Sequence, residues 1–255
     1  MEAGPAGPPI DVLVATFNSA LTLDATLAAA RRALPIHCLI VLDRSSTDGT
    51  QAIARRWGAQ VHVDDVGLGS ARNRALQLAD TEPVLFLDSD VLLTRPDFYA
   101  RALEAFRQPR TAAVVGMTVG HRFRFGLPLG LTLLGRDWAR AAGIQDRVQS
   151  RETYYLQRAA RRAGLRVRYV PDAMEHRGTY RSVPHWPEFQ GAAIRTTSGR
   201  NPRELLYAFV VILLIHMNHG RPRDVAYTPI FYAKLVRGFL HPARWGQLDR
   251  RQVSG

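Results

Sequence analysis

The chain of 255 residues contains a single cysteine, Cys38, and a single lysine, Lys234. One cysteine excludes an internal disulfide bond and any metal site built from several thiolates. Because lysine is nearly absent, arginine carries almost all of the positive charge, and the formal net charge is +12. Guanidinium groups bind phosphate oxygens through paired hydrogen bonds. The composition therefore favours an anionic partner (a nucleotide, a lipid phosphate, an acidic membrane surface or nucleic acid), although it is also compatible with a general arginine preference of the genome.

Long apolar runs are also missing. The longest, Leu205–Met217, has 13 residues, fewer than the about 17–25 that a bilayer-spanning helix needs, which predicts a buried or interfacial helix. Residues 1–9 are rich in glycine and proline and lack the apolar segment of a signal peptide. We expect these nine residues to form a disordered tail and the protein to stay on the cytoplasmic side.

Short apolar segments alternate with amphipathic ones along the first 180 residues. The pattern is typical of an α/β fold: a Rossmann-like, mostly parallel sheet with helices on both faces. Predicted strands cover residues 10–16, 39–42, 60–63, 84–87, 112–119 and 166–170, and predicted helices cover 19–34, 47–55, 71–79, 94–108 and 151–163. Phe123–Gly135 is broken by glycine and proline, which indicates a loop or short helix rather than a core strand. Pro171 is expected to end the last strand.

Polar residues follow three of the predicted strands directly. Asn18, Asp43 and Asp88 each stand where a strand ends. The carboxyl ends of parallel strands meet at one edge of a sheet, where ligands bind in open α/β folds. The sequence therefore predicts that these three turns line one crevice.

The strongest local signal is Asp88-Ser89-Asp90, directly after the apolar segment Val84–Leu87. Unpaired carboxylates are costly to bury, so they are expected to face the crevice. Two carboxylates there suit Mg²⁺ or Mn²⁺ held together with substrate phosphates. Taken alone, the same pair could simply cap a turn.

Four motifs in order change that balance, and together they resemble the family-2 glycosyltransferases of the GT-A fold. They are Ala15-Thr16-Phe17-Asn18, Asp43-Arg44-Ser45-Ser46-Thr47-Asp48-Gly49-Thr50, Gly69-Ser70-Ala71-Arg72-Asn73-Arg74-Ala75-Leu76 and Asp88-Ser89-Asp90. The family patterns that they resemble are a Pro-x-Tyr-Asn strand exit, an Asp-Asp-Gly-Ser-Thr-Asp-Gly-Thr turn, an Ala-Arg-Asn-x-Gly-Leu helix start and the Asp-x-Asp pair. The resemblance covers about residues 11–92.

The resemblance implies a site for a nucleotide diphosphate-sugar and a divalent cation, Mg²⁺ or Mn²⁺. Phe17 would stack on the base, Asp43 would hydrogen-bond it, and Arg72 would contact the diphosphate. Asp88 would contact the ribose or the metal shell, and Asp90 the metal itself. The other residues implied at the nucleotide-sugar site are Ala15, Thr16, Asn18 and Ser89. Without the neighbouring motifs, Phe17 would be interpreted as a core residue and Arg72 as a solvated one.

The second half of the site resembles the family less closely. Where many members carry a general-base aspartate in a Glu-Asp pair, this chain has Thr153, which has no useful basicity at neutral pH. We assign the base to Glu152, with Asp146 and Asp137 as alternatives, and an N-terminal helix carboxylate as the non-catalytic explanation of Glu152. His176 would be a metal or phosphate ligand by resemblance, or else a structural histidine.

The expected organisation is a catalytic GT-A domain in residues 10–180, followed by a helical, membrane-associating appendage in residues 181–255. The expected function is metal-dependent transfer of a sugar, with inversion, to an acceptor such as a polyprenyl phosphate or another lipid-linked molecule. The protein would sit peripherally at the inner face of the cell membrane, and no nucleic-acid partner is expected. A nucleotidyltransferase of related fold and a non-catalytic nucleotide-sugar-binding module are the alternatives.

The appendage carries the membrane expectation. Leu205–Met217 is more apolar than a surface helix of a soluble protein, and Ile230–Leu240 places Lys234 and Arg237 beside bulky apolar residues, as interfacial helices do. The alternative is that Leu205–Met217 completes a soluble core or a dimer interface.

Overall fold

The structure is a computed structural model that describes residues 7–144, 151, 153–177, 185–218 and 221–245. The chain divides into two compact units. The first comprises Met1–Arg147 and Glu152–Gly178, and the second comprises Val148–Arg151 and Thr179–Gly255. Each unit is described by itself.

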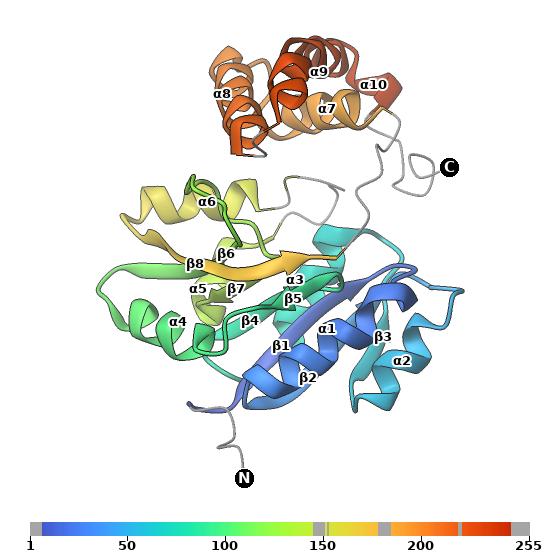
Figure 1. Ribbon diagram of the computed structural model, residues 1–255, viewed down its shortest axis with the longest axis vertical. Helices are drawn as coiled ribbons and strands as arrows, with labels where there is room; N and C mark the ends of the chain where they lie inside the picture. Colours follow the sequence, from blue (N-terminus) through green and yellow to red (C-terminus); the bar gives the residue numbers. More distant parts are fainter. Residues whose placement is uncertain (1–6, 145–150, 152, 178–184, 219–220, 246–255) are drawn as a thin grey trace. The chain divides into compact units, whose positions relative to one another are not determined.

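The first unit is built from strands alternating with helices (Figure 1). The described strands are β1 (Ile10–Thr16), β2 (Ile36–Asp43), β3 (Gln60–Val63), β4 (Val84–Asp88), β5 (Val91–Leu93), β6 (Thr111–Thr118), β7 (Leu131–Leu134) and β8 (Arg166–His176). The described helices are α1 (Ala20–Ala33), α2 (Thr50–Arg56), α3 (Leu68–Leu78), α4 (Phe98–Arg107), α5 (Arg136–Ala142) and α6 (Tyr154–Arg162).

The strands form one sheet in the order β3-β2-β1-β4-β7-β6-β8-β5. Strands β1 to β4 pair in parallel, as do β6 and β8, whereas β7 is antiparallel to both neighbours and β5 is antiparallel to β8. Only two residues separate the end of β4 from the start of β5, yet the two strands lie four places apart in the sheet order. The sheet must therefore curl, so that β8 and β5 return toward the end of β4. The predicted fold class is confirmed.

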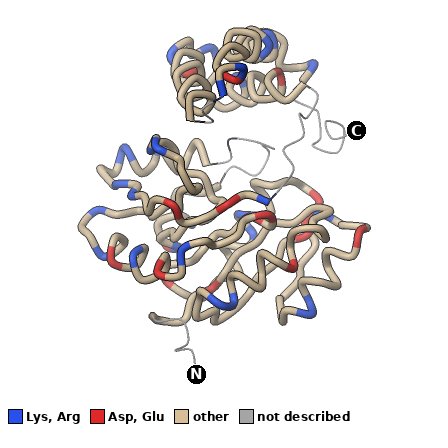
Figure 2. Tube along the Cα trace, viewed as in Figure 1, with Lys and Arg blue, Asp and Glu red and all other residues tan. Residues whose placement is uncertain are grey.

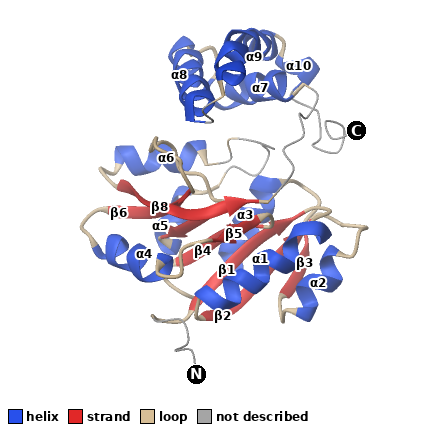
Figure 3. Ribbon diagram, in the orientation of Figure 1, coloured by secondary structure: helices blue, strands red, loops and turns tan. Residues whose placement is uncertain are grey.

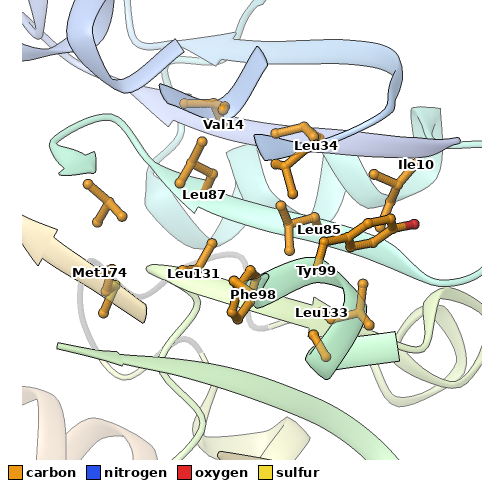
Figure 4. Packing of buried hydrophobic residues seen from close by; sticks show 14 of the residues in the cluster. Ile10, Val14, Leu34, Leu85, Leu87, Phe98, Tyr99, Leu131, Leu133 and Met174 are labelled. Carbon is orange, nitrogen blue, oxygen red and sulfur yellow. The ribbon is translucent and has the colours of Figure 1, made fainter. Parts of the chain in front are cut away.

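Strand side chains alternate between two cores, one on each face of the sheet. Val14 and Leu87 pack with the helices α1, α2 and α4, and Figure 4 shows this core around Phe98 and Leu131. Leu13 and Phe86 pack on the opposite face with α3, α5 and α6. Both faces are therefore covered, which leaves the edges of the sheet for polar chemistry.

At the amino edge of the sheet, Asp11 joins β1 to the turn before β4. Its side chain is buried and accepts hydrogen bonds from the backbone N–H groups of Asp80 and Thr81 at 2.6 and 3.0 Å, and lies 2.8 Å from His37 Nδ1. Burial alone would raise the pKa of Asp11, but the hydrogen bonds from Asp80, His37 and Thr81 hold it below its usual value. The carboxylate is therefore a structural anion, remote from the opposite edge.

Two predicted elements near the site are wrong. Residues 131–134, expected in a loop or short helix, form the fully buried strand β7 between β4 and β6. Strand β8 does not end at Pro171 but continues to His176. Pro171 falls where the register with β6 shifts, and the next residue, Asp172, has φ 52°. Proline is tolerated at such a bulge because no ladder hydrogen bond is lost there.

The elements described in the second unit are all helices, joined by short loops (Figure 3). Its helices are α7 (Trp186–Ser198), α8 (Pro202–Asn218), α9 (Pro222–Leu240) and α10 (Pro242–Trp245). Pro187 lies in the first turn of α7, where proline is compatible with a helix. None of the described helices combines the length and apolar character that crossing a bilayer would take.

Helices α7 and α9 cross at two glycines. A methyl group added at Gly191 would lie 1.8 Å from the carbonyl oxygen of Leu235, and one added at Gly238 would lie 1.8 Å from that of Glu188. The two backbones therefore approach as closely as glycine permits. Helix α8 packs along α9 through the rings of Phe209 and Tyr232 (5.0 Å between centroids).

One side of α8 completes the small core of this unit, and the other side is exposed. Leu205, Ala208 and Ile212 pack against the buried cluster of α7 and α9. Leu206 and Val210, by contrast, are 65% and 44% exposed. The suggestion that this segment contributes to a soluble core thus holds for one face of the helix only.

Candidate active site

The register of three strands brings the predicted turns together. Thr16 at the end of β1 pairs with Asp43 at the end of β2, and Ala15 pairs with Asp88 at the end of β4. These positions therefore share the carboxyl edge of the sheet, which is where ligands bind in open α/β folds.

Asp43 is completely buried, and its own chain occupies both carboxylate oxygens. Oδ1 accepts from the backbone N–H of Ser46 and from Gln51 Nε2, and Oδ2 accepts from the hydroxyls of Thr16 and Ser46, all within 2.6–2.8 Å. A carboxylate offers about four acceptor positions. A direct contact between Asp43 and a base stays a prediction, and it would require one of these four donors to move away.

Asn18 fixes the turn after β2 to the start of α1. Its backbone N–H donates to Ser46 Oγ at 2.8 Å, and its Oδ1 accepts from the N–H of Thr47 at 3.1 Å. Asp48 accepts from the N–H of Ala20 at 2.9 Å. Asn18 has φ 46°, a conformation that asparagine adopts more readily than most residues. The described contacts of Asn18 thus join the turn after β1 to the turn after β2.

Phe17 lies beside Arg44, with the Arg44 guanidinium carbon 5.9 Å from the ring centroid. Both side chains are half-buried. The backbone N–H of Arg44 donates to the carbonyl of Thr16 at 3.0 Å, so the ladder between β1 and β2 holds the two residues side by side.

Arg72 and Asp88 form a short ion pair at the end of β4. Arg72 Nη2 donates to Asp88 Oδ1 at 2.6 Å, and Arg72 is 6% exposed. The backbone N–H of Asp88 donates to the carbonyl of Gly130 at 2.8 Å. A Cβ on Gly130 would lie 3.2 Å from Asp88 Oδ2 and 3.7 Å from His176 Cε1. Gly130 is a site residue that the sequence did not reveal, since its only signal was the broken pattern of its segment.

Ser89 is held by α1. Its hydroxyl lies 2.9 Å from that of Ser19, and its carbonyl accepts from Thr26 Oγ1 at 3.1 Å. Ser19 is the N-cap residue of α1, but its side chain caps no N–H of the helix. Thr26 was not predicted. The available signal was a threonine beside Leu27 on the apolar face of an amphipathic helix.

Asp90 and His176 meet because β5 pairs with β8. Val91 is opposite His176 in the ladder, and the N–H of Arg177 donates to the carbonyl of Asp90 at 2.7 Å. His176 Nδ1 lies 3.6 Å from Asp90 Oδ1, the distance of an ion pair rather than of a hydrogen bond. The interaction with Asp90 raises the pKa of His176 above its usual value, burial opposes this, and Asp88 adds a smaller favourable charge.

A carboxylate and an imidazole at this separation suit one divalent cation. Nitrogen and oxygen donors are accepted by Mn²⁺, and Mg²⁺ favours oxygen. Within the described ranges, no group of three or more His, Cys, Asp or Glu side chains is arranged to hold a metal. The fit is therefore to a cation whose coordination is completed by substrate phosphates and water.

Of the three candidate bases, the structure describes only Asp137. Glu152 and Asp146 lie outside the described residues. Asp137 lies at the opposite edge of the sheet, where its N–H donates to Glu82 Oε2 at 3.0 Å just before β4 begins, and this excludes it as the base. Thr153 is buried at the start of α6.

The solved structures similar to this chain include two that contain a nucleotide-sugar and Mn²⁺. The mannosyltransferase PcManGT from Pyrobaculum calidifontis, solved with GDP-mannose and Mn²⁺, is 18% identical, with a TM-score of 0.67 over 96% of this chain and 90% of that one. Glucosyl-3-phosphoglycerate synthase from Mycobacterium tuberculosis, solved with Mn²⁺ and UDP-glucose, is 21% identical, with a TM-score of 0.55 over 68% of this chain and 72% of that one. At these identities the likeness shows the fold.

No curated protein matches the chain in sequence. The family model described as "Glycosyl transferase family 2" matches residues 11–145, which is more than half of the chain. This range contains the ends of β1, β2 and β4 and the ion pair between Arg72 and Asp88. The chain therefore belongs to glycosyl transferase family 2.

Proposed function

We propose that the protein transfers a sugar from a nucleotide diphosphate-sugar to an acceptor, with inversion at the anomeric carbon, and depends on Mg²⁺ or Mn²⁺. The observation that carries the proposal is the pair of contacts at the carboxyl edge, Arg72 with Asp88 and Asp90 with His176. The buried guanidinium of Arg72 and the Asp90–His176 pair, which could bind a metal ion, lie at the same edge of the sheet, where a diphosphate would bind.

Each residue has a role that its contacts support. Phe17 presents a ring on which a base can stack. Ala15 and Thr16 end β1 at the carboxyl edge of the sheet, and Asp43 with Asn18 hold the turns there in place. The proposed nucleotide-sugar site consists of these five residues, Ser89, which α1 anchors, Arg72 and Asp88.

The leaving group is the nucleoside diphosphate, and its developing negative charge must be stabilised. Arg72 contributes a guanidinium fixed by Asp88, so little reorganisation is needed when the charge develops. Asp90 and His176 would hold the cation, which supplies further positive charge at the same place. Asp88 would contact the ribose or the outer shell of the cation.

Glu152 is our candidate for the base that deprotonates an acceptor hydroxyl. Glu152→Gln should lower kcat far more than donor affinity, because a base acts in the transition state. Equal losses in both, or no loss, would move the role to Asp146. An acceptor that is already a phosphate anion needs no base. The threonine at position 153, where many family members carry the aspartate, is compatible with such an acceptor.

The released product tests the proposed reaction. We would incubate the protein with Mn²⁺, a panel of nucleotide-sugars and a polyprenyl-phosphate acceptor, and in a parallel reaction with Mn²⁺, sugar phosphates and nucleoside triphosphates, and measure nucleoside diphosphate and pyrophosphate separately. Nucleoside diphosphate is expected. Pyrophosphate, formed from a sugar phosphate and a nucleoside triphosphate, would instead identify a nucleotidyltransferase. Donor binding without release of either product would indicate a non-catalytic module.

We further propose that the second unit binds the inner face of the cell membrane and receives a polyprenyl-phosphate or another lipid-linked acceptor. Helix α8 has no buried residue, and no charged residue occurs between Leu205 and Met217. The exposed Leu206, Val210 and Met217 recur at helical spacing along one side.

The charge of this unit supports the same proposal. Residues 185–218 and 221–245 contain eight Lys or Arg and three Asp or Glu, and Figure 2 shows where these charges fall on the helices. Arg200 and Arg203 precede the apolar segment, and Arg221 and Arg223 follow it. An anionic leaflet attracts each basic residue near its surface by about 1 kcal/mol.

Vesicle co-sedimentation tests the membrane proposal. Leu206→Glu combined with Val210→Glu should release the full-length protein from vesicles of anionic phospholipid. Leu21→Glu, which alters a fully exposed leucine of α1, is the matched control and should not. Equal binding by all three proteins, or no binding by the wild type, would contradict the membrane role.

A further inference from the structure

The connection between β6 and β7 carries positive charge that the proposed donor site does not use. Gly120 and Gly126 bound its outer part, and both have φ 74°, in the left-handed region that glycine adopts most readily. Between them lies the segment His121-Arg122-Phe123-Arg124-Phe125, which we name the arginine loop. No Asp or Glu occurs from residue 119 to residue 135, so the charge of this connection is positive only.

The arginine loop is attached at the same edge of the sheet as the candidate active site. Because β7 is antiparallel to both β4 and β6, the end of β6 lies at the same edge as the end of β4. The N–H of Gly120 donates to Asp172 Oδ1 at 2.8 Å, and the hydroxyl of Tyr169 donates to the carbonyl of Gly126 at 2.8 Å. Both ends of the loop are therefore tied to β8, the strand that also carries His176.

After the loop, the chain runs directly to the candidate site. Leu127 and Leu129 are buried in the same core as Leu156 of α6, which fixes the path of this segment. The next residue, Gly130, accepts a hydrogen bond at its carbonyl from the N–H of Asp88 at 2.8 Å. The arginine loop is therefore held by rigid neighbours on both sides.

Within the loop, the aromatic rings are covered and the arginines are exposed. The rings of His121 and Phe125 meet edge to face with 5.7 Å between centroids, and the N–H of Phe123 donates to His121 Nδ1 at 3.3 Å. Both phenylalanines are half-buried, whereas Arg122 and Arg124 are exposed. Among the residues that the structure describes, Arg124 has no hydrogen-bond or ion-pair partner. Its guanidinium is therefore available to an anion from outside the chain.

An acceptor that carries a phosphate needs positive charge of its own. The diphosphate of the donor repels a second phosphate that approaches the anomeric carbon. In the proposed site, Arg72 and the cation stabilise the leaving diphosphate. Displacement with inversion places the attacking group and the leaving group on opposite sides of the carbon, so a separate cationic group has to hold the attacking phosphate.

We propose that Arg124, with added charge from Arg122, binds the phosphate of a phosphate-bearing acceptor, an inference that rests on the proposed function. A guanidinium pairs with two phosphate oxygens at once. A third oxygen of the acceptor phosphate would form the new bond to the anomeric carbon. The bond from that carbon to the diphosphate would break, and its electron pair would leave with the nucleoside diphosphate. A phosphate dianion has no proton to lose in this step.

Calorimetric titration of geranyl phosphate and of geraniol, its neutral alcohol, tests the assignment. The titrations use the full-length protein saturated with Mn²⁺ and a nucleoside diphosphate. Wild-type protein should bind geranyl phosphate at least about tenfold more tightly than geraniol, as a charge-assisted hydrogen bond allows. Arg124→Ala should weaken binding of geranyl phosphate about tenfold and leave binding of geraniol unchanged. Arg124→Lys keeps the charge without the paired geometry and should lose about threefold.

Glycerol 3-phosphate in place of geranyl phosphate distinguishes the two sources of such a phosphate. Tighter binding of geranyl phosphate would identify a lipid phosphate, in which the half-buried rings of Phe123 and Phe125 contact the apolar chain. Equal binding of the two esters, each dependent on Arg124, would identify a soluble phosphate ester. Both results support a phosphate site at Arg124.

Two controls separate acceptor binding from a structural role of Arg124. Arg107→Ala, which alters an exposed arginine of α4, should behave as the wild type. The affinity of Arg124→Ala for the nucleoside diphosphate with Mn²⁺ should stay within about threefold of wild type, because the donor phosphates are bound elsewhere. Thermal unfolding of each variant checks that the fold is kept.

Three results would overturn the inference. The wild type could bind geranyl phosphate no more tightly than geraniol, or Arg124→Ala could keep the wild-type affinity for both phosphate esters. Arg124→Ala could also lose affinity for the nucleoside diphosphate by the same factor, which would assign Arg124 to the donor phosphates. A wild type that binds no nucleoside diphosphate with Mn²⁺ would overturn the proposed function itself, and is thereby distinguishable from these three.

Discussion

Gly130→Ala is a small change placed at the centre of the candidate site. The new Cβ would lie 3.2 Å from Asp88 Oδ2, closer than ordinary contact, which begins at 3.4 Å. Asp88 cannot simply turn away, because Arg72 holds its other oxygen at 2.6 Å. The carboxylate or the strand must therefore shift by a few tenths of an ångström. Misplacing a catalytic group by about 1 Å can cost 10²-fold, so we expect a loss of roughly tenfold here.

The assay is calorimetric binding of a nucleoside diphosphate with Mn²⁺, together with kcat/KM on the preferred donor. Stability should change little, because the backbone of Gly130 lies outside the left-handed region and alanine restricts the unfolded chain. Gly135→Ala is the matched control at the other end of β7, where the nearest atom, Glu82 Oε1, is 3.4 Å away and belongs to no site residue. Wild-type binding and turnover by Gly130→Ala would refute the placement of Asp88 in the donor site.

Three further substitutions test other parts of the structure. Asp90→Ala should abolish metal-dependent nucleotide binding and leave the melting temperature unchanged; normal donor turnover would contradict the metal assignment. Asp11→Asn should lower the free energy of unfolding by about 1–3 kcal/mol at pH 7. The folded-state pKa of Asp11 lies below its unfolded value, so this difference should shrink as the pH falls through the folded pKa in urea titrations; a difference that stays constant down to pH 2 would argue against it. Gly191→Ala should separate α7 from α9, because its Cβ would lie 1.8 Å from the Leu235 carbonyl oxygen. The melting temperature followed by the helical circular dichroism signal should therefore fall; an unchanged melting temperature would mean that the two helices are less closely packed at this crossing.

Local patterns predicted the first half of the fold well because each element there is bounded by its own turn residues. The observed bounds of Ile10–Thr16 and Gln60–Val63 match the predicted ones. Strand β7 escaped prediction because Leu131–Leu134, three leucines and one threonine, is too short to show a period of its own, and only pairing with β4 and β6 makes this segment a strand. The continuation of β8 through Pro171 likewise depends on a bulge in its pairing with β6, which the sequence of β8 alone does not show.

The candidate site was predictable as a set of residues but not as a set of contacts. Position after a strand was enough to group Asp43 with Asp88. The position of Asp43 in the sequence could not show that its carboxylate accepts hydrogen bonds from Thr16, Ser46 and Gln51. Those bonds depend on the register of β1 with β2 and on the path of the turn that follows β2. Likewise, Asp137 stayed a candidate base until the direction of β7 placed it at the far edge.

The pairing of β5 with β8 also constrains how the protein comes into being. A chain growing from the ribosome presents Asp90 and the three residues of β5 long before it delivers His176. During that interval β1, β2 and β4 can already pair and bring together the residues proposed to bind the nucleotide. Strand β5, by contrast, still lacks β8, and its exposed backbone could form hydrogen bonds with a strand of another chain. Asp90 and His176, the pair proposed to bind the cation, then come together last, so a nascent or truncated chain that binds a nucleotide as proposed would do so before it could act on the sugar.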